Sequence, residues 1–81
     1  MPEQYEEPRK LTKRQLSQSR VIAKGKRIRD VQRLVEDYGG VTRNWVKKSS
    51  PPLFIEGRLA EVHWYEHHGI GRFEEKIRWL E

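Results

Sequence analysis

The sequence contains no cysteine, and this absence excludes disulfide bonds, thiolate metal sites and a thiol nucleophile. It also has no apolar run long enough to cross a bilayer, and its first residues lack the apolar core of a secretion signal. We therefore expect a soluble chain with no membrane partner. Its 81 residues make one domain, close to the size at which a single hydrophobic core is only marginally sufficient.

Several familiar catalytic and metal-binding motifs are missing as well. Gly69 and Gly71 lead into a predicted strand rather than a helix, so they do not form the phosphate loop of a nucleotide hydrolase. The serines lie in the first predicted helix or beside prolines, away from the sharp turn that a serine nucleophile needs. Imidazole and carboxylate groups gather near the C-terminus without matching a structural zinc spacing: Glu61, His63, Glu66, His67 and His68. We predict neither a metal nor a cofactor.

Positive charge is what the sequence has in excess. Seventeen Lys and Arg against twelve Asp and Glu give a formal net charge of +5, which favours polyanionic partners such as nucleic acid or an acidic protein. Residues 9–33 concentrate this charge, since Asp30 is the single acid among these cations: Arg9, Lys10, Lys13, Arg14, Arg20, Lys24, Lys26, Arg27, Arg29 and Arg33. For any one of these residues a solvated helix face is the simpler interpretation, but the whole run favours a binding role.

The N-terminal half is predicted to be helical. Residues 1–10 hold prolines and glutamates with little to bury, which is typical of a flexible tail. Thr12 and Gln15 have the spacing of a capping box, which predicts a helix start. Apolar residues at helical spacing then extend the prediction over 11–40: Val21, Ile28, Val31, Leu34, Val35 and Tyr38. Gly25 lies inside this pattern, so the segment is either one helix or a helix pair.

The C-terminal half, 41–81, is predicted to form an antiparallel sheet. Strands are expected over 41–48, at 53–55 and over 58–66, and a glycine turn then leads into the last strand. The fold class is therefore α+β, with a basic N-terminal helix or helix pair packed on a sheet of three or four strands. Its core is expected to centre on the large apolar side chains Trp45, Trp64, Phe73, Ile77 and Trp79.

The final hairpin is predicted to have one apolar face and one polar face. If Trp64 lies opposite Phe73, then Ala60 lies opposite Ile77, and the apolar residues share one side of the hairpin. The other side then gathers titratable and cationic groups: Glu61, His63, Tyr65, Arg72, Glu74, Lys76 and Arg78. Such a face is either solvated or a functional site.

This polar face has the groups that metal-independent RNA cleavage requires. The reaction needs a base for the 2′-hydroxyl, cations for the phosphorane and an acid for the departing 5′-oxygen. His63 can act as base or acid, Glu61 is a second base, and Tyr65 can donate a hydrogen bond. Lys76, Arg72 and Arg78 can hold the phosphate. Taken alone, His63 is better explained as a hydrogen-bonded histidine of the sheet, and its polar neighbours make the two explanations about equal.

Several short strings resemble the C-terminal toxin domains of bacterial polymorphic and contact-dependent growth inhibition systems. They are YGG at 38–40, WVKK at 45–48, AEVHWYE at 60–66, GIG at 69–71 and EKI at 75–77. Those domains include compact nucleases with a basic helical segment before a small antiparallel sheet. The resemblance implies a ribonuclease, often directed at tRNA, that is delivered into the cytoplasm of a target cell and neutralised by an immunity protein. At matching positions it favours His63, Tyr65, Glu66 and Lys76 as catalytic residues.

Three functions therefore remain open. The first is an RNA-cleaving toxin domain, the second a non-catalytic nucleic-acid-binding module, and the third a small structural or interaction domain. In the first two, RNA contacts are expected from the cations Arg72, Arg78, Lys24, Lys26, Arg27 and Lys47. Cleavage in the presence of EDTA distinguishes the first function from the second.

Overall fold

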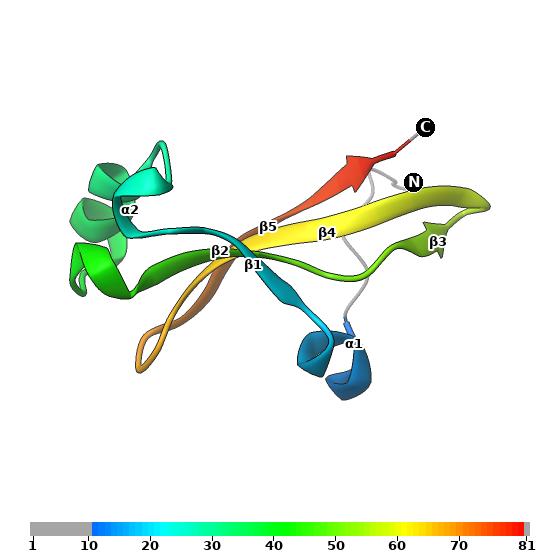
Figure 1. Ribbon diagram of the computed structural model, residues 1–81, viewed down its shortest axis with the longest axis horizontal. Coiled ribbons are helices and arrows are strands. Elements are labelled where there is room, and N and C mark those ends of the chain that lie inside the picture. The colour runs from blue at the N-terminus through cyan, green and yellow to red at the C-terminus, as the bar shows by residue number, and fades with distance from the viewer. Residues whose placement is uncertain (1–10, 81) are drawn as a thin grey trace, which may run out of the picture.

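The computed structural model describes residues 11–80, so the predicted flexible tail at 1–10 lies outside the described residues. The fold is α+β, as predicted (Figure 1). Its helical elements are α1 (Lys13–Ser17), α2 (Val31–Tyr38) and the 3₁₀ turns η1 (Gly25–Arg27) and η2 (Thr42–Asn44). Its strands are β1 (Arg20–Lys24), β2 (Trp45–Ser49), β3 (Leu53–Ile55), β4 (Arg58–His67) and β5 (Gly71–Trp79). No helix among residues 11–80 has the length and apolar character that spanning a membrane requires.

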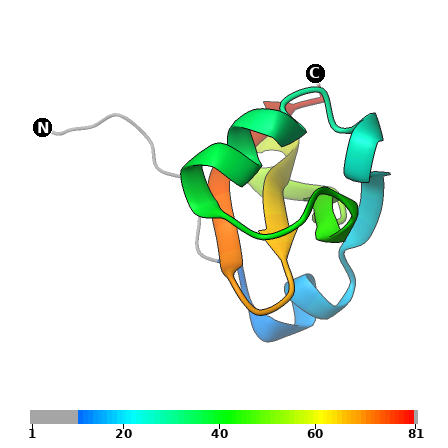
Figure 2. The same cartoon turned by 90° about the vertical axis from the view of Figure 1, so that its left-hand side faces the viewer.

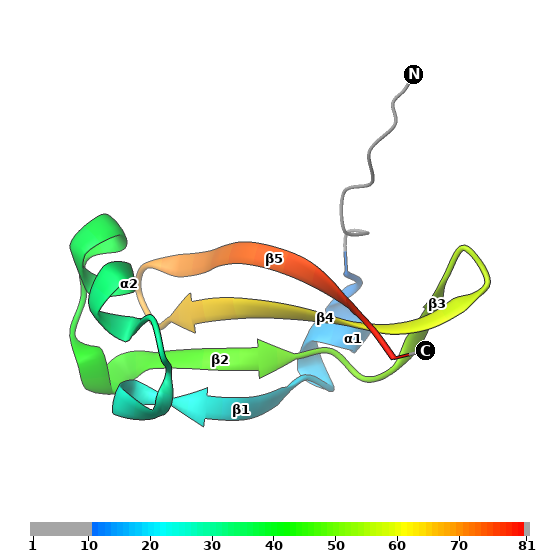
Figure 3. The same cartoon turned by 90° about the horizontal axis from the view of Figure 1, so that it is seen from above.

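The long strand β4 organises an antiparallel sheet of five strands. One edge of β4 pairs with β5 along most of its length. The other edge pairs with β2 near His67 and with β3 near Arg58, and β1 adds to the free side of β2. Seen from above, β5, β4, β2 and β1 therefore follow one another across the sheet (Figure 3).

Two small cores lie on opposite faces of this sheet. Helices α1 and α2 cover different faces, as the side and end views show (Figures 1 and 2). On the α1 face, Leu11 and Leu16 pack with Ile55, Ala60, Val62 and Trp64. On the α2 face, Ile28, Val31 and Leu34 pack with Trp45, Tyr65 and Phe73. The expectation of one core on the Ala60 and Trp64 face was wrong, because the apolar stripe of α2 covers the other face.

The helical prediction for 11–40 was right at its start and end and wrong in between. Thr12 and Gln15 form both hydrogen bonds of the capping box, at 2.9 and 3.1 Å. Residues 20–24 form β1 instead of a helix, since Val21 and Ile22 favour extended backbone and the open edge of β2 supplies hydrogen-bond partners. Gly25, with φ at +59°, then ends the strand in a conformation that side chains disfavour.

The register of the β4–β5 hairpin differs from the predicted one. Ala60 lies opposite Trp79 rather than Ile77, and His63 lies opposite Lys76. Near the turn the register slips by one residue, because a bulge places an extra residue of β5 against Trp64. As a result Phe73 lies opposite Tyr65, on the α2 face, instead of opposite Trp64.

Burial of the large side chains follows from this register. Trp45 and Trp64 are fully buried, as predicted. Phe73 and Ile77 are half-buried, while Trp79 is 37% exposed at the end of β5, where its ring packs against the guanidinium of Arg58. The core prediction for Trp79 was therefore wrong, because none of the helices among residues 11–80 lies over that end of β5 (Figure 1).

Candidate functional site

His63 lies at the centre of the face of β4 that also carries Glu61 and Tyr65. Ser49 of β2 lies opposite it on one side and Lys76 of β5 on the other. Directly opposed residues of an antiparallel pair share a face, with Cβ atoms about 5 Å apart. The sequence placed Lys76 diagonal to His63, and the observed register brings it closer.

Glu61 and His63 form a hydrogen-bonded pair. Nε2 of His63 lies 3.0 Å from Oε1 of Glu61, and both side chains are largely buried. The guanidinium of Arg20 approaches the other carboxylate oxygen at 3.5 Å. The hydrogen bond from His63, with the charge of Arg20, lowers the pKa of Glu61 although burial opposes this shift. The acid is thus held ionised.

This pairing decides which nitrogen of His63 can take up a proton. An ionised carboxylate only accepts hydrogen bonds, so Nε2 must carry a proton toward Glu61. In the neutral imidazole the lone pair is then on Nδ1, which has no hydrogen-bond partner among residues 11–80. A carboxylate behind an imidazole fixes its tautomer and stabilises the imidazolium that forms on protonation. His63 is therefore arranged to act as a base through Nδ1.

Cations surround a hollow beside His63 of about 180 Å³. Lys47 reaches it from β2, and Lys76 and Arg78 reach it from β5. The remaining lining residues are Trp64, Tyr65, Glu74 and Ile77. At roughly 30 Å³ per water molecule, the hollow has room for a group the size of a phosphate. Three cations and one imidazole thus converge on a space that fits a single phosphodiester.

Tyr65 lines this hollow and also belongs to the α2 core. Burial is the main cause of its raised pKa, so its hydroxyl stays protonated near neutral pH. Nζ of Lys47 lies 5.8 Å from the centre of its ring, at the outer limit of a cation–π contact. Tyr65 thus belongs both to the lining of the hollow and to the core beneath α2.

Glu74 forms one wall of the hollow, and its environment could not be read from the sequence. It is the extra residue of the β5 bulge and has a positive φ of +61°. Arg33 of α2 donates two hydrogen bonds to its carboxylate at 2.8 and 2.9 Å, and the Tyr38 hydroxyl donates a third at 2.8 Å. The Arg33 hydrogen bonds lower the pKa of Glu74. No spacing rule connects residues so distant in sequence, and Arg20 was missed for the same reason.

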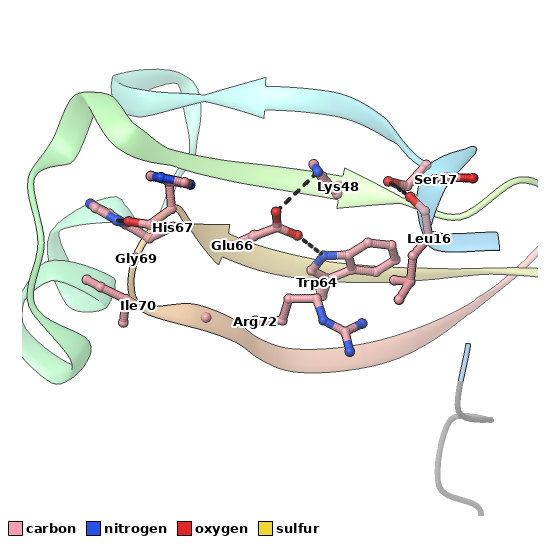
Figure 4. A pocket seen from close by; sticks show the side chains of 12 residues that line it. Leu16, Ser17, Lys48, Trp64, Glu66, His67, Gly69, Ile70 and Arg72 are labelled. Carbon is pink, nitrogen blue, oxygen red and sulfur yellow. Dashed lines mark hydrogen bonds and ion pairs between the residues drawn. The ribbon is translucent and has the colours of Figure 1, made fainter. Parts of the chain in front are cut away.

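Two predicted site residues lie on the opposite face of the sheet. The carboxylate of Glu66 accepts a hydrogen bond from the Trp64 indole at 2.9 Å and pairs with Lys48 at 3.2 Å (Figure 4). Arg72 pairs with Glu75, and its guanidinium lies 5.9 Å from the Trp64 ring. The bulge moves Arg72 to this face, where both residues line a separate groove of about 670 Å³. The structure therefore does not bring Glu66 or Arg72 together with His63.

The predicted RNA-binding residues of the N-terminal half form a separate group. Lys24, Lys26 and Arg27 lie at the end of β1 and in η1, next to Arg43 of η2. Arg43 was assigned to a strand by its sequence context, so its place in this group was missed. Among the described residues, no three His, Cys, Asp or Glu side chains are grouped so as to hold a metal ion.

Comparison with known proteins gives no relative from which a function could be transferred. No protein-family model matches the chain, and no curated protein or solved structure is significantly similar to it. The assignment of a function therefore rests on the arrangement of side chains around His63.

Proposed function

We propose that this domain is a metal-independent endoribonuclease. The observation that carries the proposal is the Glu61–His63 pair directly across the hairpin from Lys76, beside a hollow that Lys47 and Arg78 also line. A positioned base and several cations around one phosphate-sized space are the groups that RNA cleavage by its own 2′-hydroxyl requires.

In the proposed reaction, Nδ1 of His63 takes the proton of the 2′-hydroxyl. The 2′-oxygen attacks the adjacent phosphorus, the bond from phosphorus to the 5′-oxygen breaks, and a 2′,3′-cyclic phosphate forms. Glu61 stabilises the imidazolium, which then returns its proton to the departing 5′-oxygen. Lys76, Lys47 and Arg78 stabilise the charge of the phosphorane, and the Tyr65 hydroxyl donates a hydrogen bond to it.

The biological setting follows from the resemblance to bacterial toxin domains. We propose that the ribonuclease is the effector part of a delivered toxin, that it acts in the cytoplasm of the target cell on RNA such as tRNA, and that an acidic immunity protein binds it. The +5 charge supports both a polyanionic substrate and an acidic inhibitor.

Incubation of the purified domain with total bacterial RNA in EDTA tests the enzyme directly. We expect discrete fragments with 2′,3′-cyclic phosphate and 5′-hydroxyl ends. RNA that remains intact over a range of protein concentration and pH would contradict the proposal.

A non-catalytic nucleic-acid-binding module is the second candidate. It is favoured by the exposed cations Lys24, Lys26, Arg27 and Arg43, which line a hollow that has no acid or histidine among its lining residues. This function predicts salt-dependent RNA binding without cleavage, whereas a purely structural domain predicts neither.

A further inference from the structure

The turns η1 and η2 lie at the end of the β1–β2 pair, beside α2 (Figure 3), and a second group of cationic residues lies there. Lys24, Gly25, Lys26, Arg27, Thr42 and Arg43 line a hollow of about 650 Å³, which we call the basic cradle. All four of its cationic side chains belong to exposed residues. The cradle is more than three times as large as the hollow beside His63.

The fold brings the two halves of the basic cradle together through Gly25. This glycine is buried, has φ at +59°, and turns the chain from β1 into η1. A Cβ atom at this position would lie 3.6 Å from Cα of Arg43, so the backbones of η1 and η2 approach closely here. Short 3₁₀ turns on both sides then hold Lys26, Arg27 and Arg43 around one space.

The cations of the cradle line one hollow together, and none of them forms an ion pair with an acid among residues 11–80. Arg20, Arg33, Lys48 and Arg72 each form an ion pair with an acid. In contrast, Lys24, Lys26, Arg27 and Arg43 form no ion pair with any residue in 11–80. Nearby Asp30 lies 3.9 Å from Arg33 instead. Four converging cations without internal neutralisation repel one another, and a bound polyanion relieves that repulsion.

We propose that the basic cradle binds backbone phosphates of the RNA substrate several nucleotides away from the cleaved bond. The inference rests on the proposed function for its ligand. On β2, Lys24 pairs with Val46 and His63 pairs with Ser49, which is three residues further along the strand. Arg43 precedes β2 and lies six residues before Ser49 in the chain. At 3.3 Å per strand residue, the cradle is about 10 to 20 Å from His63, or about three to six stacked nucleotides. The substrate is therefore an RNA segment long enough to occupy both places.

Fluorescence anisotropy with a labelled RNA tests this second binding site without depending on cleavage. The parent protein is His63→Ala, which keeps the RNA intact, and the cradle variant adds Arg27→Ala and Arg43→Ala. The matched control adds Lys13→Ala and Arg14→Ala, which remove the same charge from exposed positions of α1. Both pairs of substitutions fall on exposed side chains, and circular dichroism checks the fold.

For an RNA of about 20 nucleotides, we expect the cradle variant to raise Kd about 10-fold and the control to raise it less than about 3-fold. The slope of log K against log salt should fall by about 1.4 in the cradle variant, at about 0.7 for each lost phosphate contact to a single strand. A dinucleotide, too short to reach both places, should show a smaller difference between the two variants.

The outcomes separate this inference from the proposed enzyme. If both variants weaken RNA binding equally, only net charge matters and the cradle is not a specific site. If neither variant changes RNA binding, the cradle is likewise overturned as a site. If only the cradle variant weakens RNA binding, and the wild-type domain leaves RNA uncut in the cleavage assay, the cradle is supported as a binding site and the ribonuclease is refuted. A wild-type domain that binds no RNA would overturn both.

Discussion

Glu61 is the residue whose surroundings are most specific to the candidate active site. Its carboxylate is largely buried, accepts a hydrogen bond from His63 and lies beside Arg20. In a mechanism through Nδ1 of His63, it has two effects: it fixes the imidazole tautomer, and it stabilises the protonated ring. The same contacts make it a source of pH-dependent stability.

We expect Glu61→Gln to reduce the free energy of unfolding at neutral pH by about 1 to 2 kcal/mol. The free energy of unfolding of this variant should also decrease less steeply as the pH is lowered. Because the pKa of Glu61 is lowered by folding, its contribution is fully present above its unfolded pKa of about 4.3 and disappears as the pH falls through the lower folded value. Urea unfolding from about pH 7 to about pH 3 measures the difference. The same change at exposed Glu36 is the control, and parallel curves for both variants would contradict the role of Glu61.

Gly40 and His67 show a second constraint at the scale of single residues. The backbone N–H of Val41 donates to Nε2 of His67 at 3.1 Å, while Nδ1 lies 2.7 Å from the carbonyl oxygen of His68. Gly40 has φ at +80°, and a Cβ atom there would lie 2.5 Å from Nε2 of His67. His67, for which the sequence indicated no role, is therefore a buried link between β4 and the α2–η2 loop.

Gly40→Ala should destabilise the domain by about 2 kcal/mol or more, through left-handed backbone strain and displacement of the His67 ring. Thermal unfolding measures the loss. Gly57→Ala is the matched control, since Gly57 has φ at +78° but nothing within 4 Å of an added Cβ atom. Equal losses in the two variants would show that backbone strain alone accounts for the effect.

Among the elements, the bulged strand β5 joins the site to α2. Glu74 holds the left-handed backbone of the bulge and receives hydrogen bonds from Arg33 and Tyr38. The Tyr38 ring stacks on Phe73 with ring centres 4.1 Å apart, so polar and apolar contacts fix α2 at the same point of β5. The position of Lys76 beside His63 depends on this bulge, because the register shift follows it.

Glu74→Ala should lower Tm and loosen the hairpin register. Arg33 is exposed, so salt screens its ion pair with Glu74 in the parent protein. The difference in Tm between Glu74→Ala and the parent should therefore be smaller at high salt. Thermal unfolding and backbone amide hydrogen exchange of β5 in low and high salt measure these effects. Glu75→Ala, which removes the neighbouring pair with Arg72, is the control, and equal protection of β5 in both variants would contradict the account.

The hydrophobic pattern of the sequence predicted which face of β4 each residue occupies better than it predicted the register between β4 and β5. Alternation along β4 correctly placed Ala60, Val62 and Trp64 on one buried face, because strand geometry imposes a period of two. The same rule correctly put Glu61, His63 and Tyr65 together. It could not give the register, since the Glu74 bulge depends on Arg33 from a distant helix. For this reason Arg72 was placed on the wrong face and Lys76 on a diagonal.

At the scale of the whole molecule, the sheet uses both faces for packing. A single small core would leave one face open, whereas α1 and α2 each cover part of a different face. The sequence did not reveal this, because the apolar stripe of α2 is compatible with either face and Tyr65 and Phe73 were not recognised as its partners. His63 is not part of the α2 core, and the hollow beside it is lined by the exposed residues Lys76 and Arg78.

The +5 charge predicts the character of an inhibitor if the domain is a toxin. Expression of the domain alone should inhibit growth, and an immunity protein should present an acidic surface that associates faster at low salt than at high salt. Stopped-flow association at two salt concentrations measures this dependence. A domain that is harmless when expressed in the cytoplasm would count against the toxin assignment.

The most direct test of the central claim is single-turnover RNA cleavage in EDTA by wild type, His63→Ala and Lys76→Ala. The proposed roles predict that each substitution lowers the cleavage rate by about 100-fold or more with RNA affinity nearly intact, whereas Tyr65→Phe costs less. Thermal unfolding of each variant shows whether the sheet is undamaged, and Arg72→Ala on the opposite face is the control. Cleavage at the wild-type rate by a folded His63→Ala protein would contradict the assignment of the active site.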